Sequence, residues 1–236
     1  MKRTCGSSGC LLLGDAKELI KLEEDESYDL IITDPPYGVG SGDKFVSSYD
    51  DAIDPFYEIL EDMYRVLKKN TRLVFFSSQK NYCEMKSAVE HSGFYVHQTL
   101  VWHRPNLFGG TRKKTYEFTN VNEWIVVAWK GSPQKANRVD WAHNTDVLKY
   151  AVPQSNFKRD KRIHVHQKPL DLIRHLILAY TNKDGRVLDP FAGSGTTAIA
   201  AEMEGRQWTA YEINEEFFMS ASLRIMRYHK SRYGKD

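Results

Sequence analysis

Three acidic residues directly follow short apolar runs of the sequence. They are Asp34, Asp189 and Glu212, and each preceding run is apolar enough to form a buried strand. Ligands of open α/β sheets bind beyond the carboxyl ends of the strands. Because parallel strands bring these ends to one edge, we expect the three carboxylates to meet there. The sequence therefore predicts a ligand site at that edge.

A glycine-rich turn follows the second of these strands and favours a nucleoside-containing cofactor. It reads Asp189-Pro190-Phe191-Ala192-Gly193-Ser194-Gly195-Thr196 and precedes an expected helix. Glycine allows close backbone approach, and a helix N-terminus offers N–H groups to a ligand. Glu212 stands nineteen residues beyond Gly193, near the roughly 20-residue offset at which an acidic side chain binds ribose hydroxyls. The turn is neither a G-x-G-x-x-G fingerprint nor a P-loop, and the alternative is a plain turn with a surface glutamate.

The first acidic residue begins the segment Asp34-Pro35-Pro36-Tyr37, whose chemistry suits an amino group. Proline has no N–H, so this backbone offers carbonyl acceptors and few donors. A carboxylate and a proline carbonyl make two fixed acceptors for the two hydrogens of an exocyclic amine. Tyr37 supplies a flat face on which a base can stack. The alternative is a rigid turn that merely ends a buried strand.

The rest of the pattern predicts an α/β fold. The expected strands are Cys10–Leu13, Tyr28–Thr33, Arg72–Phe76, Tyr95–Trp102, Trp124–Trp129, Arg186–Leu188 and Gln207–Tyr211. The expected helices are Ala16–Leu22, Phe56–Leu67, Tyr82–His91, Leu170–Thr181 and Thr196–Met203. This alternation predicts a mostly parallel sheet with helices on both faces. The runs 95–102 and 124–129 lack a helix between them, so we expect an antiparallel hairpin at the edge.

The composition excludes several classes of protein. The chain has 236 residues, 41% hydrophobic and 27% charged, which is typical of a globular protein and not of a collagen-like, coiled-coil or disordered one. No apolar run approaches the roughly 20 residues of a transmembrane helix, and the polar N-terminus is no signal peptide. Three cysteines cannot form an even disulfide framework, so a cytoplasmic location is expected, with Cys5 and Cys10 in a mobile N-terminus. No metal is expected, because the histidines lack metal-ligand spacing.

Charge is unevenly distributed along the chain, although the net charge is only +2. Residues 15–64 carry fifteen acidic and three basic residues, whereas residues 101–175 carry fourteen basic and six acidic residues. This asymmetry favours a basic face that binds a polyanion, the alternative being solvated loops. The stretches 104–120 and 130–165 are polar and poorly periodic, which is typical of functional loops.

Together these motifs resemble the amino-methylating DNA methyltransferases, which use S-adenosylmethionine and modify N6 of adenine or N4 of cytosine. Asp34–Tyr37 is similar to the family's D/S-P-P-Y motif, and Asp189–Thr196 to its D-P-F-x-G-S-G-T motif. Other resembling segments are His164–Pro169 (H-P-T-Q-K-P, with Val165 and His166 departing), Gly14–Ala16 (G-D-A), and Trp102–Asn106 with Asn122–Lys130 (a W-x-K-x-N and glutamate-to-lysine strand pair, with Arg104 for Lys). The catalytic motif comes first, as in the circularly permuted β class.

The resemblance implies a single Rossmann-like methyltransferase domain over residues 1–236, with about seven strands. It implies catalysis by Asp34, Pro35, Pro36 and Tyr37. The residues it implies for S-adenosylmethionine are Asp15, Asp34, Gln167, Lys168, Asp189, Pro190, Phe191, Gly193, Ser194, Gly195, Thr196 and Glu212, with Lys168 on the methionine carboxylate. DNA contacts are expected from loops 104–120 and 130–165, through Arg104, Arg112, Lys113, Lys114, Lys158, Arg159, Lys161 and Arg162.

Double-stranded DNA with a flipped-out base is the expected substrate, and a homodimer is a further implication of the resemblance. Asp as the first residue of the catalytic motif accompanies adenine in this family, so N6 of adenine is the expected target and N4 of cytosine the alternative. A non-catalytic nucleic-acid-binding protein of the same fold is a different class of alternative. The intact Asp34–Tyr37 segment argues against it, whereas an RNA substrate stays open.

Overall fold

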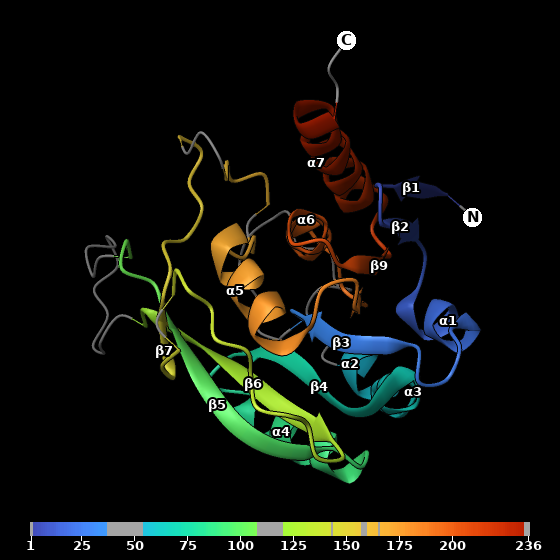
Figure 1. Ribbon diagram of the computed structural model, residues 1–236, viewed down its shortest axis with the longest axis vertical. Coiled ribbons are helices and arrows are strands. Elements are labelled where there is room, and N and C mark those ends of the chain that lie inside the picture. The colour runs from blue at the N-terminus through green and yellow to red at the C-terminus, as the bar shows by residue number, and fades with distance from the viewer. Residues whose placement is uncertain are drawn as a thin grey trace.

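All strands in the described part of the chain belong to one sheet. The computed structural model describes residues 2–36, 54–107, 120–142, 144–156, 160–164 and 166–233. The strand order is β1-β2-β9-β8-β3-β4-β6-β5-β7 (Figure 1). The bounds are β1 Arg3–Cys5, β2 Gly9–Leu13, β3 Tyr28–Thr33, β4 Leu67–Ser77, β5 Tyr95–His103, β6 Asn122–Lys130, β7 Val147–Lys149, β8 Arg186–Asp189 and β9 Gln207–Glu212.

The direction of the strands brings several chain segments to one edge of the sheet. Strands β2, β9, β8, β3 and β4 are parallel, and β6 is antiparallel to both β4 and β5. Strand β5 is antiparallel to β6, which is antiparallel to β4, so β5 runs in the same direction as β4. The carboxyl ends of β3, β4, β5, β8 and β9 therefore lie on the same side of the sheet, where β6 begins. We call this side, at the carboxyl ends of the parallel strands, the rim.

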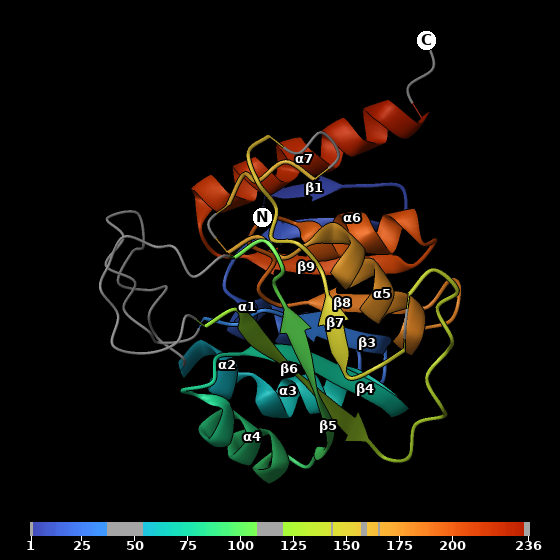
Figure 2. The ribbon, with the colours of Figure 1, turned by 90° about the vertical axis from the view of Figure 1, so that its left-hand side faces the viewer.

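Helices cover both faces of the sheet. Figures 1 and 2 show α5, α6 and α7 on one side and α2, α3 and α4 on the other. The bounds are α1 Ala16–Leu19, α2 Asp54–Glu58, α3 Leu60–Val66, α4 Tyr82–His91, α5 Leu170–Tyr180, α6 Thr196–Met203 and α7 Glu215–Tyr233, with a 3-10 turn, η1, at Ile20–Leu22. Among these elements, none is a helix with the length and apolarity needed to cross a membrane.

The central strands are apolar on both faces because each face supports a separate core. Leu30 and Ile32 of β3 belong to the cluster that contains the buried residues of α5 and α6. Ile31 lies between them in sequence and belongs to the cluster of α1, α2 and α3. This period of two is the geometry of a β-strand, and burial on both faces explains the continuous apolar run that identified β3 in the sequence.

The seven expected strands are confirmed, but the described residues form nine strands where about seven were expected. The additional strands β1 and β7 have three residues each and lie at the two edges of the sheet, so neither is long enough to give a periodic pattern. The hairpin β5–β6 is confirmed as antiparallel, although β7 and not the hairpin forms the edge. The expected helix 56–67 is two helices, because Ile59 has a ψ of 4° and interrupts it.

The expectation that Cys5 and Cys10 lie in a mobile N-terminus is wrong. The two cysteines form a disulfide across the antiparallel pair β1–β2. The turn between them is fixed by Glu202 of α6, which accepts a hydrogen bond of 2.6 Å from the Ser7 N–H. An odd total of cysteines excludes a fully paired set but not one pair, and the exposed Cys83 is the free one.

The described residues of the stretch 130–165 lie at both ends of the strands. Its first part leaves β6 at the edge opposite the rim, where Ser132 N–H donates to Asn70 Oδ1 (2.9 Å) and Asn137 N–H to the Ala179 carbonyl (2.8 Å). Strand β7 then returns parallel to β5, so the described residues after Lys149 continue from the rim. The part of this stretch that can approach a ligand at the rim is therefore its second half.

Asp189 connects the ends of two neighbouring strands at the rim. Its Oδ1 accepts hydrogen bonds from the Thr33 hydroxyl at the end of β3 (2.8 Å) and from the Phe191 N–H (3.1 Å). Burial raises the pKa of Asp189 from its ordinary value of 3.8 to about 6, although hydrogen bonds from Thr197, Thr33 and Phe191 act in the opposite direction. The folded protein therefore keeps a proton on Asp189 at pH values where the unfolded chain has lost it.

This difference predicts a pH-dependent effect of the substitution Asp189→Asn. Because the folded pKa is the higher one, the carboxyl contributes stability below about pH 4 that is lost as the pH rises to about 6. Asparagine keeps the acceptor oxygen but does not titrate. We expect the variant to gain on the order of 2 kcal/mol relative to the parent between pH 4 and pH 7. Urea unfolding of both proteins at the two pH values measures it, and a difference that is constant with pH would contradict it.

Candidate active site

Asp34 and Pro35 leave β3 at the rim. Asp34 directly follows Thr33, and Pro35 is buried while Asp34 and Pro36 are partly exposed. The proline after Asp34 favours an extended backbone, which carries the chain outward from the strand. Tyr37 lies outside the described residues, so its stacking role stays a prediction.

The ammonium group of Lys168 is buried against Asp34. Lys168 lies just before α5, its side chain is 8% exposed, and Nζ contacts Asp34 Oδ2. The rings of Phe76 and Trp102 lie beside it, with centroids 4.9 and 5.9 Å from Nζ. Lys168 was predicted to bind a methionine carboxylate, and its carboxylate partners in the structure come from the protein itself.

A second carboxylate, that of Glu123, faces the same ammonium. Glu123 is the second residue of β6 and therefore lies at the rim, with Oε1 2.9 Å from Lys168 Nζ. Burial acts to lower the pKa of Lys168, but the charges of Asp34 and Glu123 outweigh it and hold that pKa above its usual value. Glu123 belongs to the glutamate-to-lysine strand motif of the sequence, which gave it no role at the site. Lys130 at the other end of that motif lies at the opposite edge and donates to the carbonyls of Tyr64 and Leu67.

The glycine turn between β8 and α6 is open towards the rim. Gly193 and Gly195 have φ values of 49° and 71°, which favour glycine. A Cβ on Gly193 would meet no atom within 4 Å, whereas a Cβ on Gly195 would lie 3.2 Å from the Cβ of Ala221 on α7. Gly193 thus leaves space on the open side of the turn, and Gly195 allows α7 to pack closely behind it.

Glu212 lies beside this turn at the end of β9, as its spacing predicted. Its Oε2 accepts a hydrogen bond from the Gly193 N–H (2.7 Å) and its Oε1 from the Asn214 N–H (2.9 Å). Asp15 follows the neighbouring β2 and accepts from the Lys17 N–H (3.0 Å) as the N-cap of α1. The Gly14 N–H donates to the Glu212 carbonyl (2.9 Å). Asp15, which follows Gly14, and Glu212 therefore lie at the ends of two neighbouring strands.

Arg224 of α7 fixes the back of the turn, and the sequence gave no role to this residue. Its guanidinium donates to the Ser194 carbonyl (3.0 Å), to the Thr196 hydroxyl (2.8 Å) and to Asp160 (2.9 Å). Burial lowers the pKa of Arg224, against the effect of Asp160. The available signal was Asp160 itself, the one acidic residue inside the basic run 158–162.

Gln167 is buried and forms a hydrogen bond with Asp160, the residue that also binds Arg224. Its Nε2 donates to Asp160 Oδ1 (2.8 Å), while Asp160 Oδ2 accepts from the first N–H of α5, that of Leu170 (2.9 Å). Burial, followed by the neighbouring charges of His166 and Lys168, lowers the pKa of His164 to about 4. The segment before α5 is therefore a rigid support that holds Lys168 at the rim.

The predicted DNA-binding residues fall into three groups. Arg104 lies at the end of β5, but its guanidinium turns back to the carbonyls of Asn120 and Asn122 (3.0 and 3.1 Å), which does not favour a phosphate contact. Lys161 and Arg162 are exposed. The residues outside the described ranges are Arg112, Lys113, Lys114, Lys158 and Arg159.

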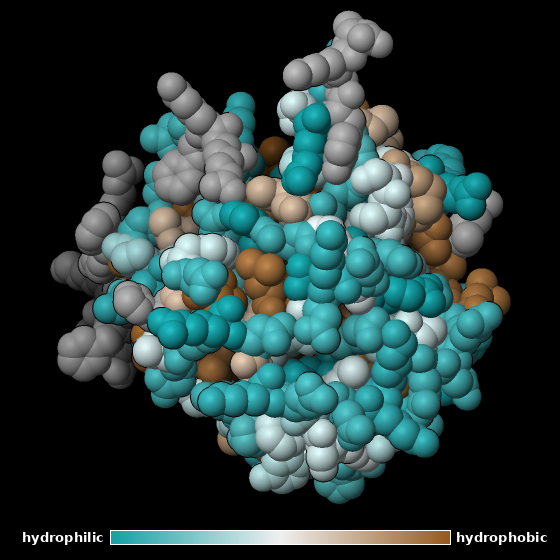
Figure 3. Space-filling view, in the orientation of Figure 1, coloured by the Kyte–Doolittle hydropathy of each residue, from teal (hydrophilic) through white to brown (hydrophobic). Residues whose placement is uncertain are grey.

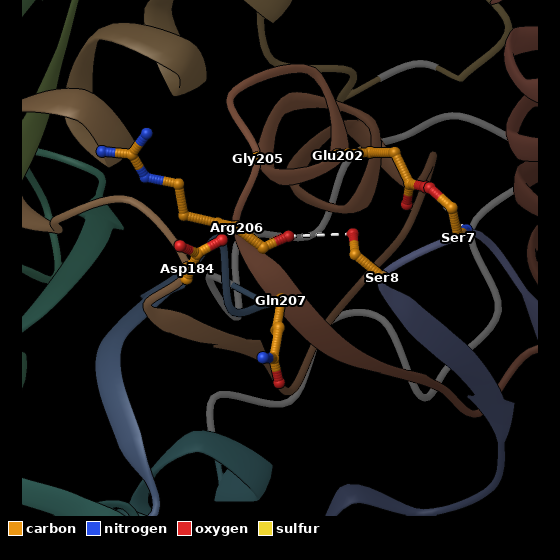
Figure 4. Close-up of a pocket in the computed structure, with 7 residues that line it drawn as sticks. All are labelled: Ser7, Ser8, Asp184, Glu202, Gly205, Arg206 and Gln207. Carbon is orange, nitrogen blue, oxygen red and sulfur yellow. Dashed lines mark hydrogen bonds between the residues drawn. The ribbon is translucent and has the colours of Figure 1, made fainter.

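A cavity in the described part of the chain lies apart from this site. The cavity, of about 500 Å³, is lined by Ser7, Ser8, Asp184, Glu202, Gly205, Arg206 and Gln207 (Figure 4). Gln207 begins β9, so this cavity is at the edge opposite the rim. Within the described ranges, no group of three or more histidine, cysteine, aspartate or glutamate residues is placed to hold a metal ion.

Solved structures of similar fold include one that is named as a DNA methyltransferase. The structure of "PvuII DNA methyltransferase (cytosine-N4-specific)" has a TM-score of 0.78 and 19% identity, and the match covers 97% of this chain and 94% of that one. The crystal structure of the M1.HpyAVI–SAM complex has a TM-score of 0.71 and 25% identity, with 91% and 98% of the two chains covered.

Proteins of similar sequence are also named as methyltransferases. The type II methyltransferase M.HpaI of Haemophilus parainfluenzae is 30% identical over 240 residues, which cover 91% of this chain and 73% of that protein. The DNA adenine methyltransferase YhdJ of Escherichia coli (strain K12) is 29% identical over 248 residues, with 91% and 82% covered. A family model described as DNA methylase matches residues 28–222. Since this match contains both rim motifs, the chain belongs to the amino-DNA methyltransferase family.

Proposed function

We propose that the protein transfers a methyl group from S-adenosylmethionine to N6 of adenine in DNA. The observation that carries the proposal is the position of the Asp34–Pro35 acceptor pair at the same rim as the open glycine turn. An amine acceptor site beside a cofactor cradle is the arrangement that an N-methyltransferase needs.

The residues of the turn fit the cofactor. The space in front of Gly193 would admit a ligand that no β-carbon obstructs, and Glu212 beside it offers carboxylate oxygens suited to ribose hydroxyls. Of the predicted cofactor residues, Asp15, Pro190, Phe191 and Gly193 would line the cradle with Glu212. Asp189, Gln167, Ser194, Gly195 and Thr196 would shape it from behind, because their hydrogen bonds and packing are within the protein.

The cofactor, when bound, supplies a methyl group on an electron-poor sulfur. Asp34 accepts one hydrogen of the target amine and the Pro35 carbonyl accepts the other, which directs the nitrogen lone pair towards the methyl group. Pro36 stiffens the segment and Tyr37 stacks on the base. A base inside a duplex cannot reach this pair, so it is flipped out at a cost of a few kcal/mol.

Adenine is the proposed target, and N4 of cytosine is the second candidate. The aspartate at position 34 supports adenine, as does the similarity to a relative named as a DNA adenine methyltransferase. The fold is shared with a cytosine-N4-specific enzyme and does not discriminate between the bases. Chromatography of nucleosides from treated duplex DNA, single-stranded DNA and RNA separates the two targets and the three nucleic acids.

The other expectations stay predictions. They are the single domain over residues 1–236, the recognition role of loops 104–120 and 130–165, catalysis without a metal ion and the cytoplasmic location. The disulfide between Cys5 and Cys10 does not favour that location.

The exposed face of α7 supports the expected homodimer. It carries an apolar stripe formed by Met219, Leu223 and Met226, with exposed fractions of 58%, 50% and 49%, and Figure 3 has apolar atoms on the surface beside α7. The helix begins with the acidic Glu215 and Glu216 and ends with the basic Arg227 and Lys230. Two antiparallel copies would pair the acidic start of one helix with the basic end of the other around the stripe.

The catalytic role predicts loss of turnover in the variant Asp34→Ala. We expect methyl transfer to fall by at least about 100-fold, because one of two amine acceptors is removed, while Lys168 keeps Glu123 as its partner. Calorimetric affinity for S-adenosylmethionine should stay within about threefold of the parent, well under 1.4 kcal/mol. The matched control is Asp25→Ala, which removes a surface carboxylate paired with Arg65. Full activity of Asp34→Ala would overturn the mechanism.

DNA binding should weaken steeply with salt. Each phosphate contact contributes about −0.9 to the slope of log affinity against log salt. If Lys161 and Arg162 contact phosphates, the double variant Lys161→Glu/Arg162→Glu should make the slope shallower by about 2. The double variant Lys135→Glu/Lys183→Glu has the same change of charge on exposed residues at the opposite edge, and it should keep the parent slope. An equal change in both double variants would mean that general charge, and not this segment, determines binding.

The proposed dimer predicts that a charge placed in the apolar stripe of α7 separates the two copies. Leu223→Lys should convert the protein to a monomer in sedimentation equilibrium, because it places a charge at the centre of the apolar contact. Ser220→Lys adds the same charge on an exposed residue at the side of the stripe and should leave the dimer intact. A parent protein that sediments as a monomer at micromolar concentration, or a Leu223→Lys variant that stays dimeric, would contradict this surface.

A further inference from the structure

Glu123 is a largely buried carboxylate at the rim that the catalytic motifs do not include. It lies opposite Trp102 in the β5–β6 pair, and its side chain is 11% exposed. Its Oε1 is 2.9 Å from Lys168 Nζ, and its Oε2 is 3.8 Å from the Arg104 guanidinium. A carboxylate removed from water is stable in such a position only when cations compensate its charge.

Four charges of alternating sign therefore form a row that begins at the catalytic residue. The row is Asp34, Lys168, Glu123 and Arg104. They come from the end of β3, the segment before α5, the start of β6 and the end of β5, which are held by the sheet and the cores. The row is neutral as a whole, and within it the Lys168 ammonium is shared between the carboxylates of Asp34 and Glu123.

Lys168 alone would be an imprecise support for Asp34. Its ammonium is attached to a flexible chain with four methylene groups, and a single carboxylate partner allows it to rotate with that partner. With Glu123 on its other side, the ammonium is held between two fixed carboxylates, with the rings of Phe76 and Trp102 beside it. Its contact with Oδ2 then fixes the rotation of the Asp34 carboxylate, which determines the direction of the lone pairs on both oxygens.

The position of the Lys168 ammonium between two carboxylates also affects how strongly Asp34 accepts a hydrogen bond. An ammonium that had Asp34 as its single partner would draw electron density from that carboxylate and weaken its bond to a substrate amine. Glu123 takes part of the ammonium's hydrogen bonding, so Asp34 keeps more of its acceptor strength. This effect is on the reacting amine and not on the binding of the cofactor.

From this geometry we propose that Glu123 is a positioning residue for methyl transfer, which acts through Lys168 to orient the Asp34 carboxylate. The proposal rests on the proposed methyltransferase function. It assigns a role to a carboxylate more than eighty residues away from the catalytic segment in sequence.

The test compares Glu123→Gln, which keeps the shape and one acceptor oxygen, with the parent protein. We expect kcat to fall by about 100-fold, since a shift of about 1 Å at a reacting group has an effect of that size. The KM values for S-adenosylmethionine and for DNA should stay within about threefold of the parent, well under 1.4 kcal/mol. A merely structural role would change both KM values together with kcat, whereas a positioning role lowers kcat alone. Glu90→Gln, which removes a surface carboxylate 2.6 Å from Lys86, is the matched control and should behave as the parent.

A double-mutant cycle with Lys168→Met shows whether Glu123 acts through the lysine. If it does, Glu123→Gln should change kcat by less than about threefold in the Lys168→Met background. Equal effects in both backgrounds, or a Glu123→Gln variant with the kcat of the parent, would overturn the proposal.

The same cycle measured by urea unfolding separates this proposal from the proposed function. The Glu123–Lys168 coupling should appear as non-additive unfolding midpoints whether or not the protein methylates DNA. Absence of methyl transfer by the parent protein on every nucleic acid would contradict the proposed function. Additive midpoints would contradict the row of charges, and with it the role of Glu123.

Discussion

The burial of the Lys168 ammonium constrains the whole rim. A buried cation has to be compensated by carboxylates close to it, and here these carboxylates belong to segments that follow or begin different strands. Asp34 follows β3 and Glu123 begins β6, with β4 between those two strands. Asp34, the proposed amine acceptor, is therefore held in place only when the order β3-β4-β6 is formed and the segment before α5 lies across it.

A second set of contacts holds that segment to the glycine turn. Asp160 binds Gln167, the first N–H of α5 and the guanidinium of Arg224, while Arg224 also binds the Ser194 carbonyl. The proposed amine acceptor and the proposed cofactor turn are thus connected through residues that need touch neither substrate. For an in-line transfer this rigidity matters more than any single contact, because the reacting atoms have to be held within a few tenths of an ångström.

The sequence predicted the central strands well, because burial on both faces of a strand produces a continuous apolar run. The outermost strands β1 and β7 were not predicted, because three residues are too few to show an alternation of apolar and polar side chains. The positions of Asp34, Gly193 and Glu212 at one rim also followed from the sequence, because parallel strands bring their ends together. The partners of Lys168 and Arg224 could not be predicted, because charge pairing between segments 45 to 134 residues apart depends on side-chain geometry and leaves no local pattern. The disulfide differs from these cases, because an odd number of cysteines does not exclude one pair, and the short Gly-Ser turn between Cys5 and Cys10 brings the two thiols together.

The rim also explains why the fold alone does not identify the target base. A cytosine-N4-specific enzyme shares this fold with a TM-score of 0.78, and both bases present an exocyclic amine to an enzyme. Discrimination therefore has to come from the groups around the amine, where the strength and direction of the acceptors differ. In this chain the proposed acceptor Asp34 is a carboxylate in contact with Lys168, and Lys168 is itself shared with Glu123. The proposed choice of adenine therefore rests on the aspartate at position 34 together with the charged groups that surround it.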